Sequence, residues 1–193
     1  MKIRFRDKDA LIIVDVQKDF CPGGALAVPS GDEVVPILNT YIEIFEKHDA
    51  MIIATRDWHP DNHTSFIDYG GIWPPHCVQN TEGADFHSDL KLPPDVIIIS
   101  KADTPEKEAY SGFDGTNLEK ILKSRGIQRL FIGGLATDYC VRATVLDAIR
   151  QGFFTFLLLD AVKGVNINPE DSERAIIDML EKGAVGLTFQ DLK

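Results

Sequence analysis

Only three residues of the chain are cysteines, Cys21, Cys77 and Cys140, and their spacings follow no pattern. Small secreted domains held together by disulfides use dense, even-numbered sets of cysteines, so a disulfide framework is excluded. A chain of 193 residues buries about 70% of the surface of its unfolded form and needs no such cross-links to fold. At least one of the three thiols is therefore a candidate for chemistry.

Long hydrophobic runs and an excess of basic residues are also missing. No 18 consecutive residues are apolar, and residues 1–9 are charged, which argues against a membrane span and a secretory signal. The chain has 20 basic and 30 acidic residues. Nucleic acids and anionic membranes attract basic surfaces, so neither is an expected partner. We expect a cytoplasmic protein.

Two phosphate-binding signatures are absent as well. The pattern G-x-G-x-x-G does not follow the first apolar run, and G-x-x-x-x-G-K-[ST] occurs nowhere in the sequence. Binding of a dinucleotide or a nucleoside triphosphate therefore has no support from motifs.

What the sequence does contain is a regular alternation of strand and helix patterns. Short apolar runs rich in β-branched residues predict six strands, at 10–16, 51–55, 96–100, 130–133, 154–159 and 185–189. Their nearly continuous apolar character is typical of a parallel sheet covered on both faces. Helical periodicity predicts helices at 34–48, 118–125, 139–151 and 169–182. This order predicts one α/β domain over residues 1–193, a three-layer α/β/α sandwich around a six-stranded, mainly parallel sheet.

Three polar residues stand where predicted strands end or helices begin. Asp15 closes the first strand, Lys101 follows the third, and Cys140 opens the helix after the fourth. The carboxyl ends of parallel strands meet at one edge of a sheet, so these side chains should converge there. A helix start and a nearby ammonium favour a thiolate, and a carboxylate can move its proton. The three groups together suit acyl transfer by a nucleophilic thiol.

Each of these residues taken alone has an ordinary structural interpretation. Asp15 could cap a turn, Lys101 could be a solvated charge, and Cys140 could be a small core residue. Their joint placement at one sheet edge favours a site over three coincidences. Cys21 and Cys77 have no helix start to activate them, so they rank below Cys140 as nucleophiles.

The segment 56–95 is too long for an ordinary loop, and it contains four of the five histidines and both tryptophans. Asp57, His59 and His76 could bind a divalent metal through three protein ligands with an open position, which is typical of catalytic sites. His63 could be a fourth ligand or a hydrogen-bonding neighbour, and His87 should lie outside the site. Loop histidines are also common as surface residues. Zinc, iron and manganese all suit these ligand types.

Five segments, taken in order, resemble motifs of the nicotinamidases in the isochorismatase-like (cysteine hydrolase) superfamily. They are DVQKDF at 15–20, RDWHP at 56–60, WPPHC at 73–77, Lys101, and GLATDYCV at 134–141. The resemblance spans essentially the whole chain, and it implies the Rossmann-like fold of the isochorismatase-like hydrolases.

The resemblance also implies a role for each matched residue. Cys140 would be the nucleophile, Asp15 the base and then the acid, and Lys101 the cation that supports both. The peptide between Leu135 and Ala136 would be cis, and the N–H groups of Ala136 and Cys140 would form an oxyanion hole. The metal ligands would be Asp57, His59 and His76, and a flat aromatic ring would lie between Phe20 and Trp73.

The implied reaction is hydrolysis of nicotinamide to nicotinate and ammonia through a Cys140 thioester. One divalent metal ion, with zinc as the first choice, would hold the pyridine nitrogen. Pyrazinamide would be a second substrate, and the product would enter pyridine nucleotide salvage. Two alternatives stay open: an amidase of the same superfamily with a carbamoyl or maleamate-type substrate, and a non-catalytic protein whose metal only pins the long loop. Family members range from monomers to higher oligomers, so a homo-oligomer is left open too.

Overall fold

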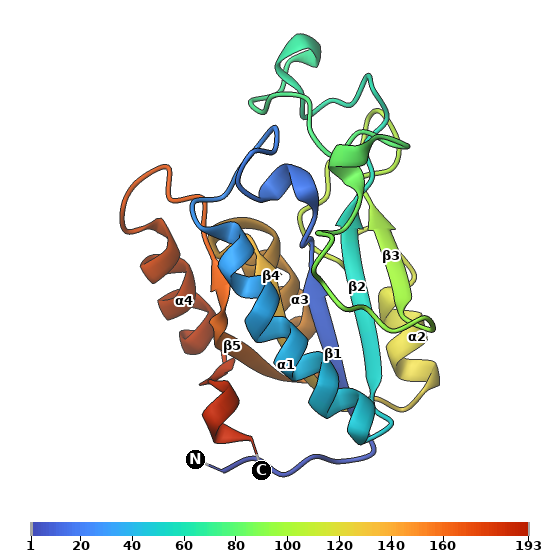
Figure 1. Ribbon diagram of the computed structural model, residues 1–193, viewed down its shortest axis with the longest axis vertical. Coiled ribbons are helices and arrows are strands. Elements are labelled where there is room, and N and C mark those ends of the chain that lie inside the picture. The colour runs from blue at the N-terminus through green and yellow to red at the C-terminus, as the bar shows by residue number, and fades with distance from the viewer. Residues whose placement is uncertain (1, 193) are drawn as a thin grey trace.

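Residues 2–192 are described by a computed structural model of the chain, in which helices pack on both faces of a central sheet (Figure 1). The sheet has six strands in the order β3-β2-β1-β4-β5-β6, and each neighbouring pair is parallel. The predicted α/β/α sandwich is therefore confirmed. The strands are β1 Asp9–Val14, β2 Met51–Asp57, β3 Ile97–Lys101, β4 Arg129–Leu135, β5 Phe154–Lys163 and β6 Val185–Leu187.

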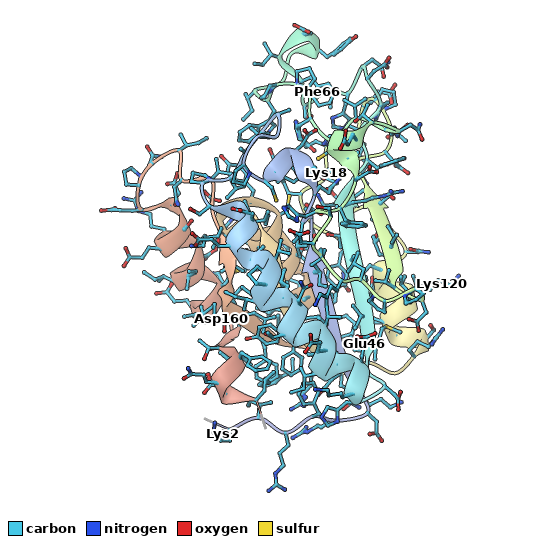
Figure 2. The ribbon with its side chains drawn as sticks, viewed as in Figure 1. Lys2, Lys18, Glu46, Phe66, Lys120 and Asp160 are labelled. Atoms are coloured by element: carbon cyan, nitrogen blue, oxygen red, sulfur yellow. The ribbon has the colours of Figure 1, made fainter. Side chains whose placement is uncertain are left out.

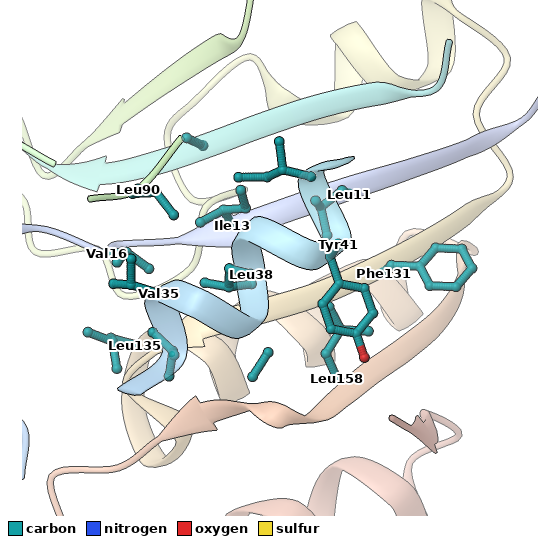
Figure 3. Packing of buried hydrophobic residues seen from close by; sticks show 14 of the residues in the cluster. Leu11, Ile13, Val16, Val35, Leu38, Tyr41, Leu90, Phe131, Leu135 and Leu158 are labelled. Carbon is teal, nitrogen blue, oxygen red and sulfur yellow. The ribbon is translucent and has the colours of Figure 1, made fainter. Parts of the chain in front are cut away.

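Side chains of β1 divide between the two hydrophobic cores. Leu11 and Ile13 join the cluster beneath α1 (Val34–Lys47), which Figure 3 shows from close by. Ala10 and Ile12 point to the opposite core. That core also contains residues of the remaining helices, which are α2 Leu118–Ser124, α3 Arg142–Arg150 and α4 Asp171–Glu181. Since both faces are covered, the strands are apolar on both sides, which explains their continuous hydrophobic runs.

Several predicted boundaries are wrong by a few residues. β1 ends at Val14 rather than at residue 16, because Asp15 adopts a left-handed φ of 49° that stops the strand. The helix predicted at 139–151 begins instead as a π-helical turn, Thr137–Val141, and continues as α3. β5 runs on to Lys163, and β6 stops early because Thr188 and Asp191 form a capping box around a short 3-10 helix.

The last helix is followed by a glycine with a positive φ. α4 ends at Glu181, and Gly183, two residues later, has a φ of 114°. Glycine is favoured there because a residue with a Cβ atom is strained at a positive φ. Pro169 stands two residues before the first helical residue, Asp171, so it precedes α4 rather than beginning it.

The long connection from β2 to β3 has only two short helical turns among the described residues, Ile67–Tyr69 and Glu82–Ala84. It forms the upper end of the molecule in Figure 1, and Figure 2 places Phe66 there, on the far side of Lys18 from Glu46. The connection therefore stands over the carboxyl ends of the strands, where the candidate site residues lie. Across residues 2–192, none of the helices is both long and apolar enough to cross a membrane.

Candidate active site

Asp15, Lys101 and Cys140 meet at the carboxyl edge of the sheet, and all three are buried. Lys101 Nζ lies 2.8 Å from Asp15 Oδ2 and 3.4 Å from Cys140 Sγ. The other oxygen of Asp15 accepts a hydrogen bond of 2.6 Å from the Thr55 hydroxyl. The structure thus brings the carboxylate, the ammonium and the thiol into one contact group, as the strand ends predicted.

Asp57, His59 and His76 form a second group immediately beside the first. One ligand atom from each residue lies within 4.8 Å of the other two, and all three side chains are buried. Asp57 Oδ2 is 3.5 Å from His59 Nε2 and 3.9 Å from His76 Nε2. A carboxylate and two imidazoles at this spacing match the hard and borderline ligands of a divalent metal.

The outer nitrogens of both imidazoles are held by backbone carbonyls. His59 Nδ1 contacts the Ala102 oxygen at 3.1 Å, and His76 Nδ1 contacts the Pro74 oxygen at 2.7 Å. A hydrogen bond from Nδ1–H fixes the tautomer and leaves the Nε2 lone pair for a metal. Because both Nε2 atoms face Asp57, the residues fit a bound metal ion.

His63 does not join this group. Its Nδ1 accepts a hydrogen bond of 3.2 Å from the Ser65 backbone N–H, and its Nε2 lies 3.0 Å from the Lys107 carbonyl oxygen. The ring stacks on that of His59 with a centroid distance of 4.2 Å. Of the two alternatives that the sequence left open, this geometry matches the hydrogen-bonding neighbour, since both ring nitrogens already have partners.

A small pocket is lined by the metal group and by Cys140 of the first group. Cys140 and Ala136 line one side, and the peptide bond between Leu135 and Ala136 is cis. Phe20 and Trp73 line it as well. The nucleophile candidate, the metal group and two aromatic side chains therefore share one small cavity.

The family can be assigned at this point, because the isochorismatase domain matches residues 9–191. The chain belongs to the isochorismatase family. The nicotinamidase of Escherichia coli (strain K12) is 40% identical to it over 203 residues, which cover 94% of this chain and 95% of that protein.

Solved structures agree with the family assignment. The pyrazinamidase of Pyrococcus horikoshii in complex with zinc is 56% identical, covers 94% of this chain and 99% of its own, and superposes with a TM-score of 0.91. PnC1 from L. infantum in complex with nicotinate is 35% identical, with coverage of 100% and 99% and a TM-score of 0.92. The isochorismatase-like hydrolase fold of this chain is therefore shown over its whole length.

Burial decides the resting charge of the thiol in this isochorismatase-family protein. It raises the pKa of Cys140 well above the usual value, although the Lys101 ammonium opposes the shift. The sequence predicted that a helix start would favour the thiolate, but Cys140 is buried within the π-helical turn. Desolvation of the anion, together with the charges of Asp15 and Asp57, outweighs the attraction of Lys101. Burial therefore opposes ionisation of the thiol in the absence of a base.

The neighbouring charges are strongly coupled. Burial alone would lower the pKa of Lys101, but the carboxylates of Asp15 and Asp57 outweigh it and raise that pKa well above its usual range. The pKa of Asp57 shifts in the other direction. Burial would raise it, but Lys101 and His59 bring it well below the usual value. Burial raises the pKa of Asp15, which suits a group that must accept a proton.

Two hydrogen-bonding residues near the site were not predicted from the sequence. Gln17 pairs with the peptide groups of Asp57: its Nε2 donates to the Asp57 oxygen and its Oε1 accepts from the Asp57 N–H, both at 2.8 Å. Asp138 accepts from the backbone N–H groups of Val165 at 2.9 Å and Asn166 at 2.8 Å. Gln17 belongs to the DVQKDF motif and Asp138 to GLATDYCV. Their membership of these motifs is the one feature of the sequence that could have indicated a role near the site.

Two further pocket residues, Tyr110 and Glu108, were also not predicted. The Trp73 indole Nε1–H donates to the Tyr110 hydroxyl at 3.1 Å, so Tyr110 fixes one aromatic wall of the pocket. Both residues lie in the connection between β3 and α2, which has no histidine, cysteine or metal-ligand spacing. Nothing in the sequence distinguished them from ordinary loop residues.

The other two cysteines lie outside the pocket lining. Cys21 and Cys77 are both buried, and burial raises the pKa of Cys21 to about 11. Burial also raises the pKa of Cys77 well above the usual value. His87 is likewise absent from the metal group and from the pocket wall. These three positions agree with the lower rank that the sequence gave them.

Proposed function

We propose that this chain is a nicotinamidase, which hydrolyses the carboxamide of nicotinamide to nicotinate and ammonia. The observation that carries the proposal is the shared pocket: Cys140, Lys101 and Asp15 adjoin Asp57, His59 and His76 at one aromatic-lined cavity. The names of the relatives support it, since they include a nicotinamidase, a pyrazinamidase with zinc and a protein with nicotinate.

In the proposed acylation, Asp15 takes the proton of the Cys140 thiol as Sγ attacks the carboxamide carbon. Lys101, 3.4 Å from Sγ, stabilises the thiolate as it forms. The N–H groups of Ala136 and Cys140 would face the oxyanion, where one such donor is typically worth about 2.7 to 4 kcal/mol. Asp15 then gives its proton to the amide nitrogen, ammonia leaves, and the acyl group remains on Sγ as a thioester.

Deacylation uses the same groups in reverse. Asp15 accepts a proton from a water molecule, whose oxygen attacks the thioester carbonyl. The C–S bond breaks, the proton returns from Asp15 to Sγ, and the product leaves as nicotinic acid, which releases its carboxyl proton to water to give nicotinate. Asp15 has a raised pKa and lies against Lys101. It can therefore accept a proton and give it back in both half-reactions.

Asp57, His59 and His76 would hold one divalent metal, for which we propose zinc because the Pyrococcus horikoshii relative is in complex with that ion. The metal would supply an electrophilic point for the pyridine nitrogen and thereby orient the ring. Phe20 and Trp73 would pack on the ring faces. Pyrazinamide, with nitrogen at the same ring position, would be a second substrate.

The decisive test is ammonia release from nicotinamide by the purified, metal-loaded protein. Cys140→Ala should reduce the release to background, and Cys21→Ala should retain it, because Cys21 lies outside the pocket. Failure of the wild-type protein to release ammonia from nicotinamide would overturn the proposal. Release from maleamate or a carbamoyl compound in the same assay would then identify the amidase alternative.

A second test addresses the metal. Asp57→Asn should abolish stoichiometric zinc binding and most of the ammonia release. Asp61→Asn, an exposed position four residues along the same loop, should leave both unchanged. Zinc bound at the native level by Asp57→Asn would contradict the proposed ligand set.

We further propose that the protein is a cytoplasmic enzyme and that its product enters pyridine nucleotide salvage. The partner that binds in the pocket is a small molecule.

A further inference from the structure

Glu108 lines the pocket but belongs to neither chemical group within it. The residue is half-buried, and its Oε1 accepts a hydrogen bond of 2.9 Å from the backbone N–H of the next residue, Ala109. This local contact fixes the carboxylate without neutralising its charge. The proposed mechanism uses Asp15, Lys101, Cys140 and the metal, and it assigns no role to Glu108.

The charge of Glu108 has no cationic partner among residues 2–192, where every ion pair joins other residues. The adjacent Lys107 turns away and pairs with Asp114 at 3.0 Å. Glu108 nonetheless borders the pocket, whose wall it shares with His76 of the metal group and with Cys140. A carboxylate without a cationic partner among residues 2–192 is therefore part of the pocket wall.

The reaction changes the charge of whatever fills this cavity. The substrate carboxamide is neutral, and the product carboxylate is an anion near neutral pH. A fixed like charge in a partly desolvated pocket repels the product while leaving a neutral molecule almost unaffected. Discrimination between two similar ligands commonly depends on such a repulsive element.

We propose that the Glu108 carboxylate makes the pocket discriminate against the carboxylate product in favour of the neutral amide. The inference rests on the proposed nicotinamidase function and adds a specificity-determining residue to it. Glu108 acts by charge alone, so the isosteric Glu108→Gln variant keeps the acceptor oxygen for Ala109 and removes only the repulsion. Glu106→Gln is the matched control, because Glu106 is exposed and lies outside the pocket lining.

The test compares inhibition by nicotinate with inhibition by uncharged 3-acetylpyridine, in the zinc-loaded wild type and both variants. In Glu108→Gln the ratio of the nicotinate Ki to the 3-acetylpyridine Ki should fall about three- to tenfold, as expected for loss of one nearby like charge. Glu106→Gln should keep the wild-type ratio. Added salt should lower the nicotinate Ki of the wild type more than that of Glu108→Gln, because salt screens the repulsion.

Two results would overturn the inference alone: an unchanged ratio in Glu108→Gln, or an equal fall in Glu106→Gln. Zinc content is measured for each sample, and a ratio that changes only in proportion to lost zinc would overturn it as well. If Glu108→Gln does not fold, the salt dependence of the wild type decides, and a nicotinate Ki that rises with salt rejects repulsion. Absence of nicotinamide hydrolysis by the wild type would instead overturn the proposed function itself.

Discussion

Lys101 and Asp57 end neighbouring parallel strands in register, and the Lys101 ammonium donates a hydrogen bond to Asp57 Oδ1. The same ammonium lies 2.8 Å from Asp15 Oδ2. One buried cation therefore joins the thiol group to the metal group. Without it, the buried carboxylates of Asp15 and Asp57 would lie within 4.8 Å of each other with no cation between them.

Replacement of this cation should affect both stability and turnover. In Lys101→Gln, the uncompensated carboxylates should reduce the free energy of unfolding by about 3 to 5 kcal/mol. Ammonia release should fall roughly 10²- to 10⁴-fold, because proton transfer and thiolate stabilisation both depend on Lys101. Urea unfolding and ammonia assays measure the two effects, with the exposed Lys91→Gln as control. Native turnover in a folded Lys101→Gln protein would contradict the proposed role.

Gln17 should control metal affinity although it is not in the metal group. Its side chain pairs with both peptide groups of Asp57, each at 2.8 Å. Gln17→Leu removes these partners, so the Asp57 carboxylate loses its fixed position and zinc affinity should fall about 10- to 100-fold. Competition with a chromophoric chelator measures this change, and the exposed Gln151→Leu serves as control. Equal zinc affinity in Gln17→Leu and the wild type would show that Asp57 is positioned by other contacts.

Tyr110 should position the Trp73 indole against the substrate. Tyr110→Phe removes the acceptor of the 3.1 Å hydrogen bond from Trp73 Nε1 and frees the ring to rotate. We expect the KM for nicotinamide to rise about three- to tenfold, as for the loss of about 1 kcal/mol of hydrogen bonding, with a smaller change in kcat. Trp73 emission, measured in a Trp58→Phe background, should shift. Tyr69→Phe at the exposed loop tip should alter neither quantity.

Tyr41 should make the stability of the fold sensitive to alkaline pH. Burial, followed by the hydrogen bond to Asp160 at 2.8 Å, raises the Tyr41 pKa far above its usual value of 10.0. A raised pKa in the folded state stabilises the protein fully below pH 10, and this contribution is lost as the pH rises above the pKa of the unfolded state. The wild type should therefore lose more stability than Tyr41→Phe between pH 9 and 12. Urea midpoints across that range measure the difference, and parallel curves would contradict it.

The amino-acid sequence predicted much of this architecture because the relevant signals are local. Continuous apolar runs identified the six strands, and the order of the elements predicted the sandwich. Parallel strands bring their carboxyl ends together, so the sequence alone places Asp15 and Lys101 at one edge of the sheet. The boundaries were less accurate at residues with special backbone conformations, such as Asp15 with its φ of 49°.

Other features depend on contacts between residues far apart in the chain. Gln17 binds a peptide 40 residues away, and Trp73 binds Tyr110 37 residues away. Glu108 belongs to none of the sequence motifs, and only the folded structure shows that it lines the pocket. The protonation of Cys140 also could not be predicted, because the sequence shows a helix start and a lysine but not the depth of burial that outweighs them.

The sequence by itself determined the order of the elements, the edge of the sheet at which the polar residues gather, and the residue types available for a thiol and a metal. Those properties follow from local hydrophobic periodicity and from strand direction. Only the tertiary structure decided which histidines face Asp57, which side chains enclose the pocket, and which ionisable groups lose their water. The reason is that distance and desolvation are set by packing between segments that the sequence keeps far apart.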